Sequence, residues 1–210
     1  GISRFYRVSL NANDVFSATV TPAEGSLLAP QIGWLQVGGF QTGVGANGQL
    51  VLSAGQAADY IIVVRDLVAG GGDNYGFTFD AQVYALDELE ERDEVEPNDD
   101  VESADSVAAS SRVHGLLEEG DEDWFPVTLE VGQTLTAVTT FGRSQASVDT
   151  ILELLGPAPD AVRLRYDDDG GDGAFSNIGT FAAEEAGTYF LKVSLFGNRG
   201  GDYSLLVFIE

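Results

Sequence analysis

The sequence contains no cysteine, which excludes disulfide bonds, thiolate metal sites and a cysteine nucleophile. It also contains no methionine, so we expect that Gly1 is not a translation start. Lysine occurs once, at Lys192, and the chain has 10 basic and 34 acidic residues, for a net charge of -24. Nucleic acids and anionic membranes are bound through Lys and Arg, so neither is an expected partner. No stretch approaches the roughly 20 apolar residues of a membrane-spanning helix, which argues against membrane insertion.

The residues that are present indicate a folded, all-β protein. Hydrophobic residues make up 44% of the chain, enough to form a packed core. The 26 glycines indicate many turns, and closely spaced turns are typical of all-β structure. A length of 210 residues suits one large domain or two small ones. The acidic excess is typical of salt-adapted or calcium-rich exterior settings, although it also simply provides solubility.

Two parts of the chain repeat the same pattern of apolar residues. Residues 5–10 and 124–129 alternate apolar and polar side chains, as half-buried strands do. Each segment continues through a short polar turn into a second alternating segment, at 15–20 and at 134–139. A strand, a short turn and a second strand predict a hairpin. The apolar positions agree in phase throughout, which indicates an internal repeat.

The later parts of the two copies match as well. Residues 58–64 correspond to residues 187–193, and a glycine-rich turn follows each segment. A strand that begins with Tyr75 or Tyr203 then closes each copy. Two matched hairpins in the same order make chance similarity improbable.

We therefore predict two tandem antiparallel β-sandwich domains, at residues 1–86 and 94–210. The intervening residues 87–93 are nearly all charged and are predicted to form an acidic linker. The second copy has a long segment before Trp124, whereas only four residues precede Phe5 in the first copy. The first copy is therefore expected to lack the opening segment of the sandwich.

A short acidic segment opens the second copy and contains Glu94, Glu96, Asn98 and Asp99. Alternate residues of an extended chain point the same way, so Glu94, Glu96 and Asn98 can converge. Pro97 restricts the backbone and favours an extended conformation at Glu96. Calcium takes roughly 6–8 oxygen ligands, which this segment can partly supply. From the residues alone, a polar linker with an Asx-type turn at Asn98 and Asp99 is the simpler explanation.

The second copy resembles the bacterial pre-peptidase C-terminal domain family. The resemblance rests on an ordered set of residues, namely 94–99, Ala104, Gly115, 121–127, 132–135, 148–154, 167–170, 186–189 and 201–205. It covers nearly all of residues 94–210. The first copy resembles the family more weakly and lacks the opening motif.

The resemblance implies a jelly-roll-like β-sandwich that is attached to secreted proteases and other exported proteins and is usually non-catalytic. Relatives include the collagen-binding domains of clostridial collagenases, in which a matching Glu-x-Glu-x-Asn-Asp run binds calcium. The resemblance thus implies Ca²⁺ as a cofactor and the ligands Glu94, Glu96, Asn98 and Asp99. Asp121 and Asp123, in the loop before Trp124, are expected as further ligands. The first copy has Ile2 and Arg4 at the positions of these two aspartates, so no equivalent site is expected there.

The remaining acidic turn, Asp149 and the single histidine are not expected to form a metal or catalytic site. Residues 167–173 resemble a calcium loop, but the twelfth position is Ile178 rather than Glu, so a tight acidic turn is the better interpretation. Asp149 is expected to make a structural turn contact. The single histidine, His114, is expected in a surface turn, and no Gly-x-Ser-x-Gly nucleophile motif accompanies it. We therefore expect no enzyme activity.

Three functions are compatible with this sequence. The first is a secreted, non-catalytic, calcium-binding module for adhesion or targeting of an exported protein to an extracellular polymer, protein or cell surface. The second is a structural subunit of an extracellular assembly, in which strand exchange between copies completes the shortened first domain. The third is a C-terminal propeptide or secretion module of a secreted protease. Each of them places the protein outside the cell.

Overall fold

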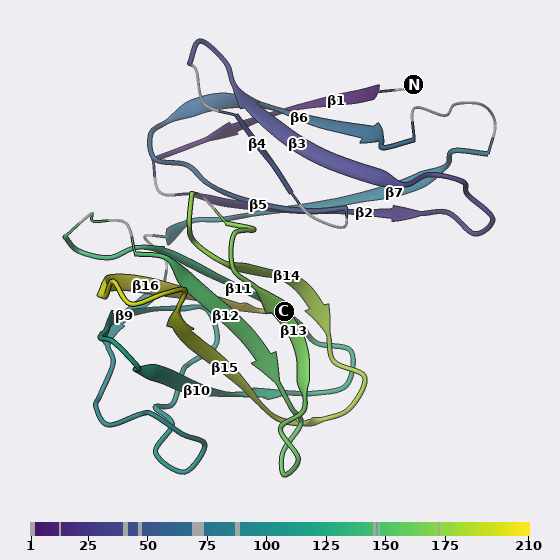
Figure 1. Ribbon diagram of the computed structural model, residues 1–210. Coiled ribbons are helices and arrows are strands. Elements are labelled where there is room, and N and C mark those ends of the chain that lie inside the picture. The colour runs from purple at the N-terminus through teal and green to yellow at the C-terminus, as the bar shows by residue number, and fades with distance from the viewer. Residues whose placement is uncertain are drawn as a thin grey trace. The chain divides into compact units, whose positions relative to one another are not determined.

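The regular elements of the described residues are β-strands, as predicted from the alternating pattern of the sequence (Figure 1). The structure is a computed structural model that describes residues 3–12, 14–39, 42–45, 48–68, 74–86, 89–144, 146, 148–171 and 173–210. The chain divides into two compact units, residues 1–87 (unit 1) and residues 88–210 (unit 2). Within the described residues no helix has the length and apolar character that crossing a bilayer requires.

Unit 1 contains two antiparallel sheets. The four-stranded sheet has the order β1 (Ser3–Leu10), β6 (Ala58–Asp66), β3 (Pro30–Gln36) and β4 (Thr42–Val44). The three-stranded sheet has the order β5 (Gln49–Ser53), β2 (Val15–Pro22) and β7 (Phe77–Tyr84). Inward-facing side chains of both sheets, among them Phe16, Ile32 and Tyr60, form one core.

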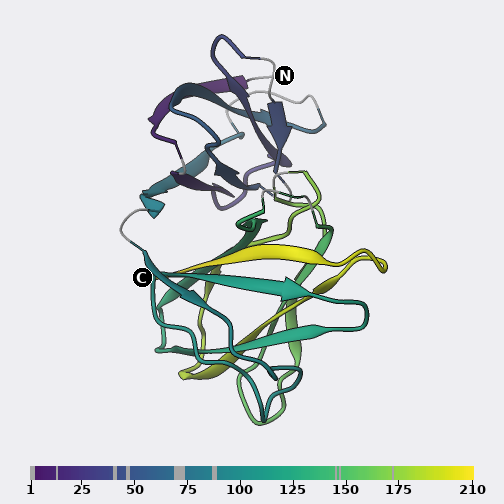
Figure 2. The same cartoon turned by 90° about the vertical axis from the view of Figure 1, so that its left-hand side faces the viewer.

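Unit 2 is a larger sandwich of the same kind (Figure 2). Its four-stranded sheet has the order β10 (Glu122–Leu129), β15 (Gly187–Leu195), β12 (Thr150–Leu155) and β13 (Arg163–Asp167). Its five-stranded sheet has the order β14 (Asn177–Ala182), β11 (Thr134–Phe141), β16 (Gly201–Ile209), β9 (Ser111–Leu117) and β8 (Glu90–Asp93). Strand β8 pairs with β9 in parallel, and the other pairings are antiparallel.

The two units repeat one topology. The order β1-β6-β3-β4 corresponds to β10-β15-β12-β13, and β5-β2-β7 corresponds to β14-β11-β16. The registers agree residue by residue, since Val8 lies opposite Tyr60 and Val127 lies opposite Tyr189. Both tyrosines are buried, and each hydroxyl donates a hydrogen bond to the carbonyl four residues earlier in the chain. The internal repeat was predicted from alternating apolar and polar residues. In the structure, the two units also share their strand order and the surroundings of corresponding side chains.

The predicted linker over residues 87–93 requires a correction. Residues 87 and 88 lie outside the described part of the chain, but Glu90–Asp93 form strand β8 at the edge of the larger sheet of unit 2. Such a charged run can form a strand here because basic side chains lie beside it. Glu91 lies 3.5 Å from Arg112, and Asp93 lies 2.5 Å from Arg143. Strands β8 and β9 have no counterpart among the described residues of unit 1.

The core of unit 2 is complete along β10. Phe125, Val127 and Leu129 point inward and are fully buried. Each such side chain contributes roughly 1.5–3 kcal/mol relative to an exposed position. Asp123 occupies the next inward position of the same strand and is also fully buried. A buried carboxylate at the end of a row of apolar side chains is costly unless its charge is paired. We therefore expect a charge partner for Asp123 at this end of the sandwich.

Candidate metal centre

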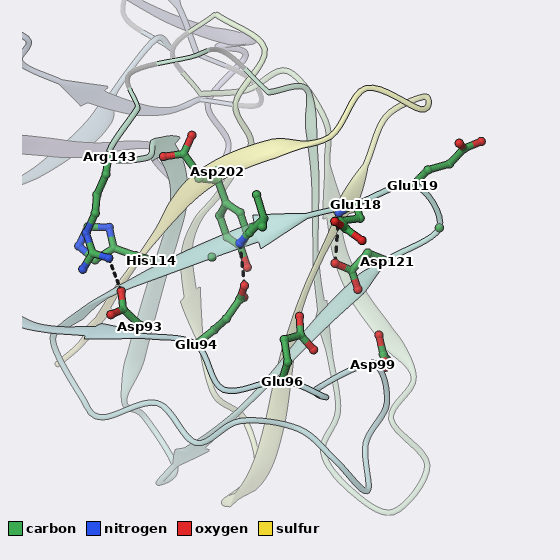
Figure 3. Close-up of a pocket in the computed structure, with 14 residues that line it drawn as sticks. Asp93, Glu94, Glu96, Asp99, His114, Glu118, Glu119, Asp121, Arg143 and Asp202 are labelled. Carbon is green, nitrogen blue, oxygen red and sulfur yellow. Dashed lines mark hydrogen bonds and ion pairs between the residues drawn. The ribbon is translucent and has the colours of Figure 1, made fainter.

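The segment that leads into unit 2 lies across the ends of several strands. The backbone N–H of Glu94 donates to the carbonyl of His114 at 3.0 Å, which extends the pairing of β8 with β9 by one residue. The side chain of Glu94 accepts a hydrogen bond from the backbone N–H of Leu116 at 2.6 Å. Glu94 is therefore held by both its main chain and its side chain (Figure 3).

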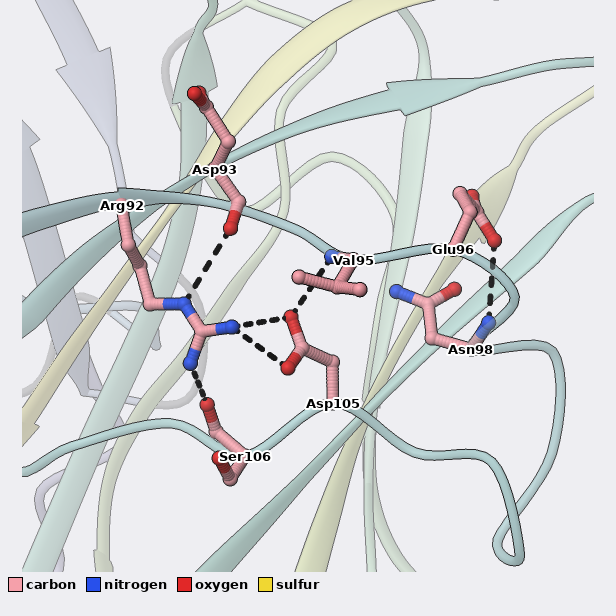
Figure 4. A network of polar contacts seen from close by, with 7 residues as sticks. All are labelled: Arg92, Asp93, Val95, Glu96, Asn98, Asp105 and Ser106. Atoms are coloured by element: carbon pink, nitrogen blue, oxygen red, sulfur yellow. Dashed lines mark hydrogen bonds and ion pairs between the residues drawn. The ribbon is translucent and has the colours of Figure 1, made fainter.

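The segment then turns and runs along the edge of β10. The N–H of Trp124 donates to the carbonyl of Asn98 at 2.9 Å, and the N–H of Asp105 donates to the carbonyl of Trp124 at 2.8 Å. An ion pair ties the two ends of this turn together, because Arg92 donates to both carboxylate oxygens of Asp105 at 2.6 Å (Figure 4). The same carboxylate accepts the N–H of Val95 at 3.0 Å. The loop that carries Glu94, Glu96 and Asn98 is therefore anchored at both ends.

Three carboxylates converge where this loop meets β10. Glu94, Glu96 and Asp123 each contribute an oxygen, and these oxygens lie within 4.8 Å of one another. Asp123 comes from strand β10. Figure 3 shows the two glutamates on the segment of residues 94–105 between β8 and β9, which we call the lead-in. The hydroxyl of Tyr203, on β16, donates to one oxygen of Asp123 at 2.5 Å. Chain segments from both sheets thus position the cluster.

Several buried polar atoms of the cluster and of the neighbouring Asn98 have no hydrogen-bond partner among the described residues. They are one oxygen each of Glu94 and Asp123, and both polar atoms of the Asn98 side chain. Asn98 and Asp123 are 0% exposed. Leaving a buried polar group unpaired costs about 1–3 kcal/mol, and more for a charged group. Buried, unpaired oxygens that face one another are what a cation site requires.

The electrostatics of the cluster indicate a deficit of positive charge. Burial, followed by repulsion from Glu94, raises the pKa of Asp123 to about 9. Burial also raises the pKa of Glu94 and of Glu96, and neighbouring carboxylates such as Asp121 add to both shifts. A bound divalent cation would reverse this effect by favouring the ionised carboxylates.

Glu94 and Glu96 line a surface pocket, and Asp99 and Asp121 line the same pocket. A side-chain hydrogen bond with Asp121, with a smaller contribution from desolvation, raises the pKa of the exposed Asp99. The turn between β9 and β10 fixes Asp121, since its N–H donates to the carbonyl of Glu118 and its carboxylate accepts the N–H of Glu118, each at 3.2 Å. Glu119 also lines this pocket. Of the six predicted ligand residues, Glu94, Glu96, Asp99 and Asp121 line one pocket. An oxygen of Asp123 lies within 4.8 Å of oxygens of Glu94 and Glu96, and Asn98 is buried in the same segment as the two glutamates.

The donor set fits calcium. All candidate donors are carboxylate or amide oxygens, which suit a hard cation that takes roughly 6–8 oxygen ligands. Glu94, Glu96, Asn98 and Asp123 would supply the inner oxygens, and Asp99 and Asp121 would add ligands from the rim. The nitrogen and sulfur donors that zinc prefers are not among these six residues.

Sequence reasoning missed two residues that shape this centre. Tyr203 supports Asp123 from a strand that lies 80 residues further along the chain. Gly115 allows the close packing, because a Cβ atom there would lie 2.3 Å from the ring of Tyr203 and 2.6 Å from a carboxylate oxygen of Glu94. Both residues belong to segments that carry the family resemblance, but their pairing becomes visible only in the register of β9 with β16.

His114 does not lie in a surface turn, contrary to expectation. It is in strand β9 and is 9% exposed, because β8 and β16 flank it. Its Nδ1 lies 3.1 Å from the hydroxyl of Ser204, and its Nε2 lies 3.7 Å from Glu91. Burial, with the charges of Arg112 and Arg143, lowers the pKa of His114. This serine-histidine-glutamate arrangement gives no accessible nucleophile, because Ser204 is 0% exposed.

The acidic segment after β13 forms a tight turn. The carboxylate of Asp167 accepts the N–H groups of Gly170 and Asn177 at 2.7 and 2.8 Å. Asp172 lies outside the described residues. Burial, followed by the charges of Asp169 and Asp168, raises the pKa of Asp149, and one of its buried oxygens lacks a partner among the described residues. Asp167 thus acts as a turn-forming carboxylate.

Comparison with known proteins bears on unit 2. Residues 121–195 match the sequence model of the bacterial pre-peptidase C-terminal domain, which confirms the family predicted for the second copy in the segment that includes β10 and β15. No curated protein matches the sequence.

Three of the solved structures that this chain is similar to each match 50% of it. The pre-peptidase C-terminal domain of collagenase from Bacillus anthracis is 19% identical, with a TM-score of 0.41 over 50% of this chain and 93% of its own. PliG from Aeromonas hydrophila, a periplasmic inhibitor of g-type lysozyme, is 18% identical, with a TM-score of 0.40 over 50% and 94%. PliG from Salmonella Typhimurium is 22% identical, with a TM-score of 0.36 over 50% and 96%.

Proposed function

We propose that the chain is a non-catalytic, calcium-binding β-sandwich module that holds an exported protein at an extracellular polymer or protein surface. One observation carries the calcium assignment: carboxylate oxygens of Glu94, Glu96 and Asp123 converge to within 4.8 Å, and a buried oxygen of Glu94 and one of Asp123 have no hydrogen-bond partner among the described residues. The family match in the same unit and the strongly acidic composition agree with it. The buried position of Ser204 agrees with a non-catalytic role.

A calcium titration followed by thermal unfolding tests the metal site. Calcium at 100 times its dissociation constant should stabilise the protein by about 2.7 kcal/mol, because only the folded state presents the site. Magnesium at the same concentration should stabilise it less, since it demands near-octahedral geometry and gives up its water reluctantly.

Paired variants make this test specific. Replacement of Glu96 and Asp99 by Ala should abolish the calcium effect. Glu184→Ala with Glu185→Ala removes the same charge from an exposed turn outside the pocket and serves as the matched control. Equal stabilisation by calcium in both double variants would exclude the site proposed here.

The role at a surface can be tested separately from the metal. The protein, with calcium or with a chelator, is mixed with insoluble extracellular polymers such as collagen fibres or a polysaccharide and then sedimented. Co-sedimentation that depends on calcium supports the targeting role. A protein that binds calcium but stays in the supernatant with every polymer retains the metal site and loses the targeting role.

A further inference from the structure

The acidic residues of the two units are distributed differently. Of the 10 basic and 34 acidic residues, three and seven lie in residues 1–87, so unit 1 has a net charge of -4 and unit 2 has a net charge of -20. The acidic residues of unit 1 lie at least seven positions apart along the chain. In unit 2, eleven acidic residues lie in two short segments without a basic residue, the lead-in and residues 118–123, which we call the β9–β10 segment. The charge of unit 2 is thus concentrated, whereas that of unit 1 is dispersed.

The fold holds these two like-charged segments together. The N–H of Trp124, which directly follows the β9–β10 segment, donates to the carbonyl of Asn98 in the lead-in at 2.9 Å. Figure 3 shows acidic side chains of both segments around one pocket. Three of them come from the lead-in and three from the β9–β10 segment, namely Glu94, Glu96, Asp99, Glu118, Glu119 and Asp121. Backbone hydrogen bonding therefore keeps close together two segments whose charges repel each other.

The basic residues of unit 2 offset little of this charge. Five of the seven form ion pairs, but only two of these five reach the lead-in or the β9–β10 segment. Arg92 pairs with Asp105 of the lead-in, and Lys192 pairs with Glu122 of the β9–β10 segment. Among the described residues, no Lys or Arg forms an ion pair with the other nine acidic residues of the two segments. The repulsion among these nine is therefore not compensated by a basic side chain in the part of the chain that the structure describes.

Dissolved ions can reach this contact. Glu96 and Asp99 of the lead-in and Glu118 of the β9–β10 segment are exposed. Desolvation, followed by repulsion from Asp121, Asp99 and Glu118, raises the pKa of Glu96, so the charges act across the contact. The range of such interactions falls from about 30 Å at 0.01 M salt to about 3 Å at 1 M. The repulsion between the two segments therefore depends on the salt concentration.

We propose that monovalent salt stabilises unit 2, and hardly affects unit 1, by screening the repulsion between the lead-in and the β9–β10 segment. Each exposed pair of like charges shifts a folding equilibrium by about twofold, so about four such pairs amount to about tenfold. Unit 2 is thereby adapted to saline surroundings, in which its charges are screened but still oppose aggregation. The inference needs no bound ion, so it stands independently of the calcium site.

The test is urea unfolding in a chelator at neutral pH, with sodium chloride varied from about 0.01 M to about 1 M. Trp34→Phe leaves Trp124 as the fluorescent reporter of unit 2, and Trp124→Phe leaves Trp34 as the reporter of unit 1. We expect the equilibrium constant for folding of unit 2 to rise about tenfold across this range and that of unit 1 to change far less. Unit 1 is the internal control, because general effects of salt on apolar burial act on both units. An equal change in both units, or no change in unit 2, overturns the proposal.

Paired variants test where the repulsion arises. Glu118→Gln with Glu119→Gln removes two exposed charges from the β9–β10 segment, and neither residue is a predicted calcium ligand. This double variant should stabilise unit 2 in dilute salt and reduce its response to added salt. Glu184→Gln with Glu185→Gln removes two exposed charges from a turn outside the pocket and is the matched control. An equal gain from both double variants in dilute salt contradicts a source between the two segments.

A change of cation separates screening from the binding of a particular ion. Screening depends on ionic strength and not on the identity of the ion, so tetramethylammonium chloride should stabilise unit 2 about as much as sodium chloride does. Stabilisation by sodium chloride alone indicates a bound sodium ion and overturns the proposal. Because every sample contains chelator, a protein that responds to salt but not to a separate calcium titration supports this inference and refutes the calcium site. The reverse result refutes this inference alone.

Discussion

The stability of calcium-free unit 2 should fall as pH rises, because Asp123 holds a proton in the folded state. Burial and the charge of Glu94 raise its pKa to about 9, whereas an aspartate in an unfolded chain has a pKa of about 3.9. Between these values the folded protein binds a proton that the unfolded protein has released. The free energy of unfolding therefore falls by about 1.4 kcal/mol per pH unit across this window. From about pH 5 to about pH 8 the loss amounts to about 4 kcal/mol.

The assay is urea unfolding in a chelator at a series of pH values, followed by tryptophan fluorescence. The chain has two tryptophans, Trp34 in unit 1 and Trp124 in unit 2. A Trp34→Phe background leaves Trp124 as the only reporter, which is needed because two units need not unfold together. Saturating calcium should make the free energy of unfolding independent of pH over this range, because the ion binds the carboxylates in their deprotonated form.

The variant Asp123→Asn supplies the control. Asparagine keeps the shape of the aspartate side chain but does not titrate. In chelator, the free energy of unfolding of this variant should therefore change little with pH. At about pH 8 this variant should be more stable than the unaltered protein in chelator and should gain nothing from calcium. A free energy of unfolding that stays level or rises from about pH 5 to about pH 8 in the calcium-free protein would refute the reasoning.

Three further predictions concern the same region. Tyr203→Phe removes the hydroxyl that donates to Asp123 and should cost about 1–3 kcal/mol of stability, measured by urea unfolding, and weaken calcium binding in calorimetry. Gly115→Ala places a Cβ atom 2.3 Å from the Tyr203 ring and should destabilise unit 2 by about 1–3 kcal/mol in the same assay. Arg92→Ala leaves the carboxylate of Asp105 without its ion pair. Amide hydrogen exchange should become faster in the segment from residue 92 to residue 105 and stay unchanged in β12.

Much of the fold could be predicted because local alternation determines it. The inward positions of β10 and β11 follow from the period of two, and their agreement with β1 and β2 revealed the repeat before any pairing was known. Strand β8 was missed because its residues are charged, and the cations that allow it to pair, Arg112 and Arg143, come from later in the chain. A local pattern carries no information about such distant partners.

The candidate site shows the same division. The residues Glu94, Glu96 and Asn98 could be selected from their spacing and the family resemblance. The support that Asp123 receives from Tyr203 could not, because it depends on two strands from different sheets meeting at one end of the sandwich. The burial of His114 was missed for a related reason: a histidine beside a glycine is typical of a turn, but here Gly115 leaves room for a tyrosine ring inside a sheet.

The ion pair between Arg92 and Asp105 has a mechanical consequence. Tension that passes along the chain from unit 1 enters unit 2 at β8, and it reaches the pairing with β9 and this ion pair before it reaches Glu94 and Glu96. A cation held by those glutamates and Asp123 would fasten the lead-in to β10 just behind the first point of strain. The calcium concentration around the protein would then influence the force at which unit 2 begins to open.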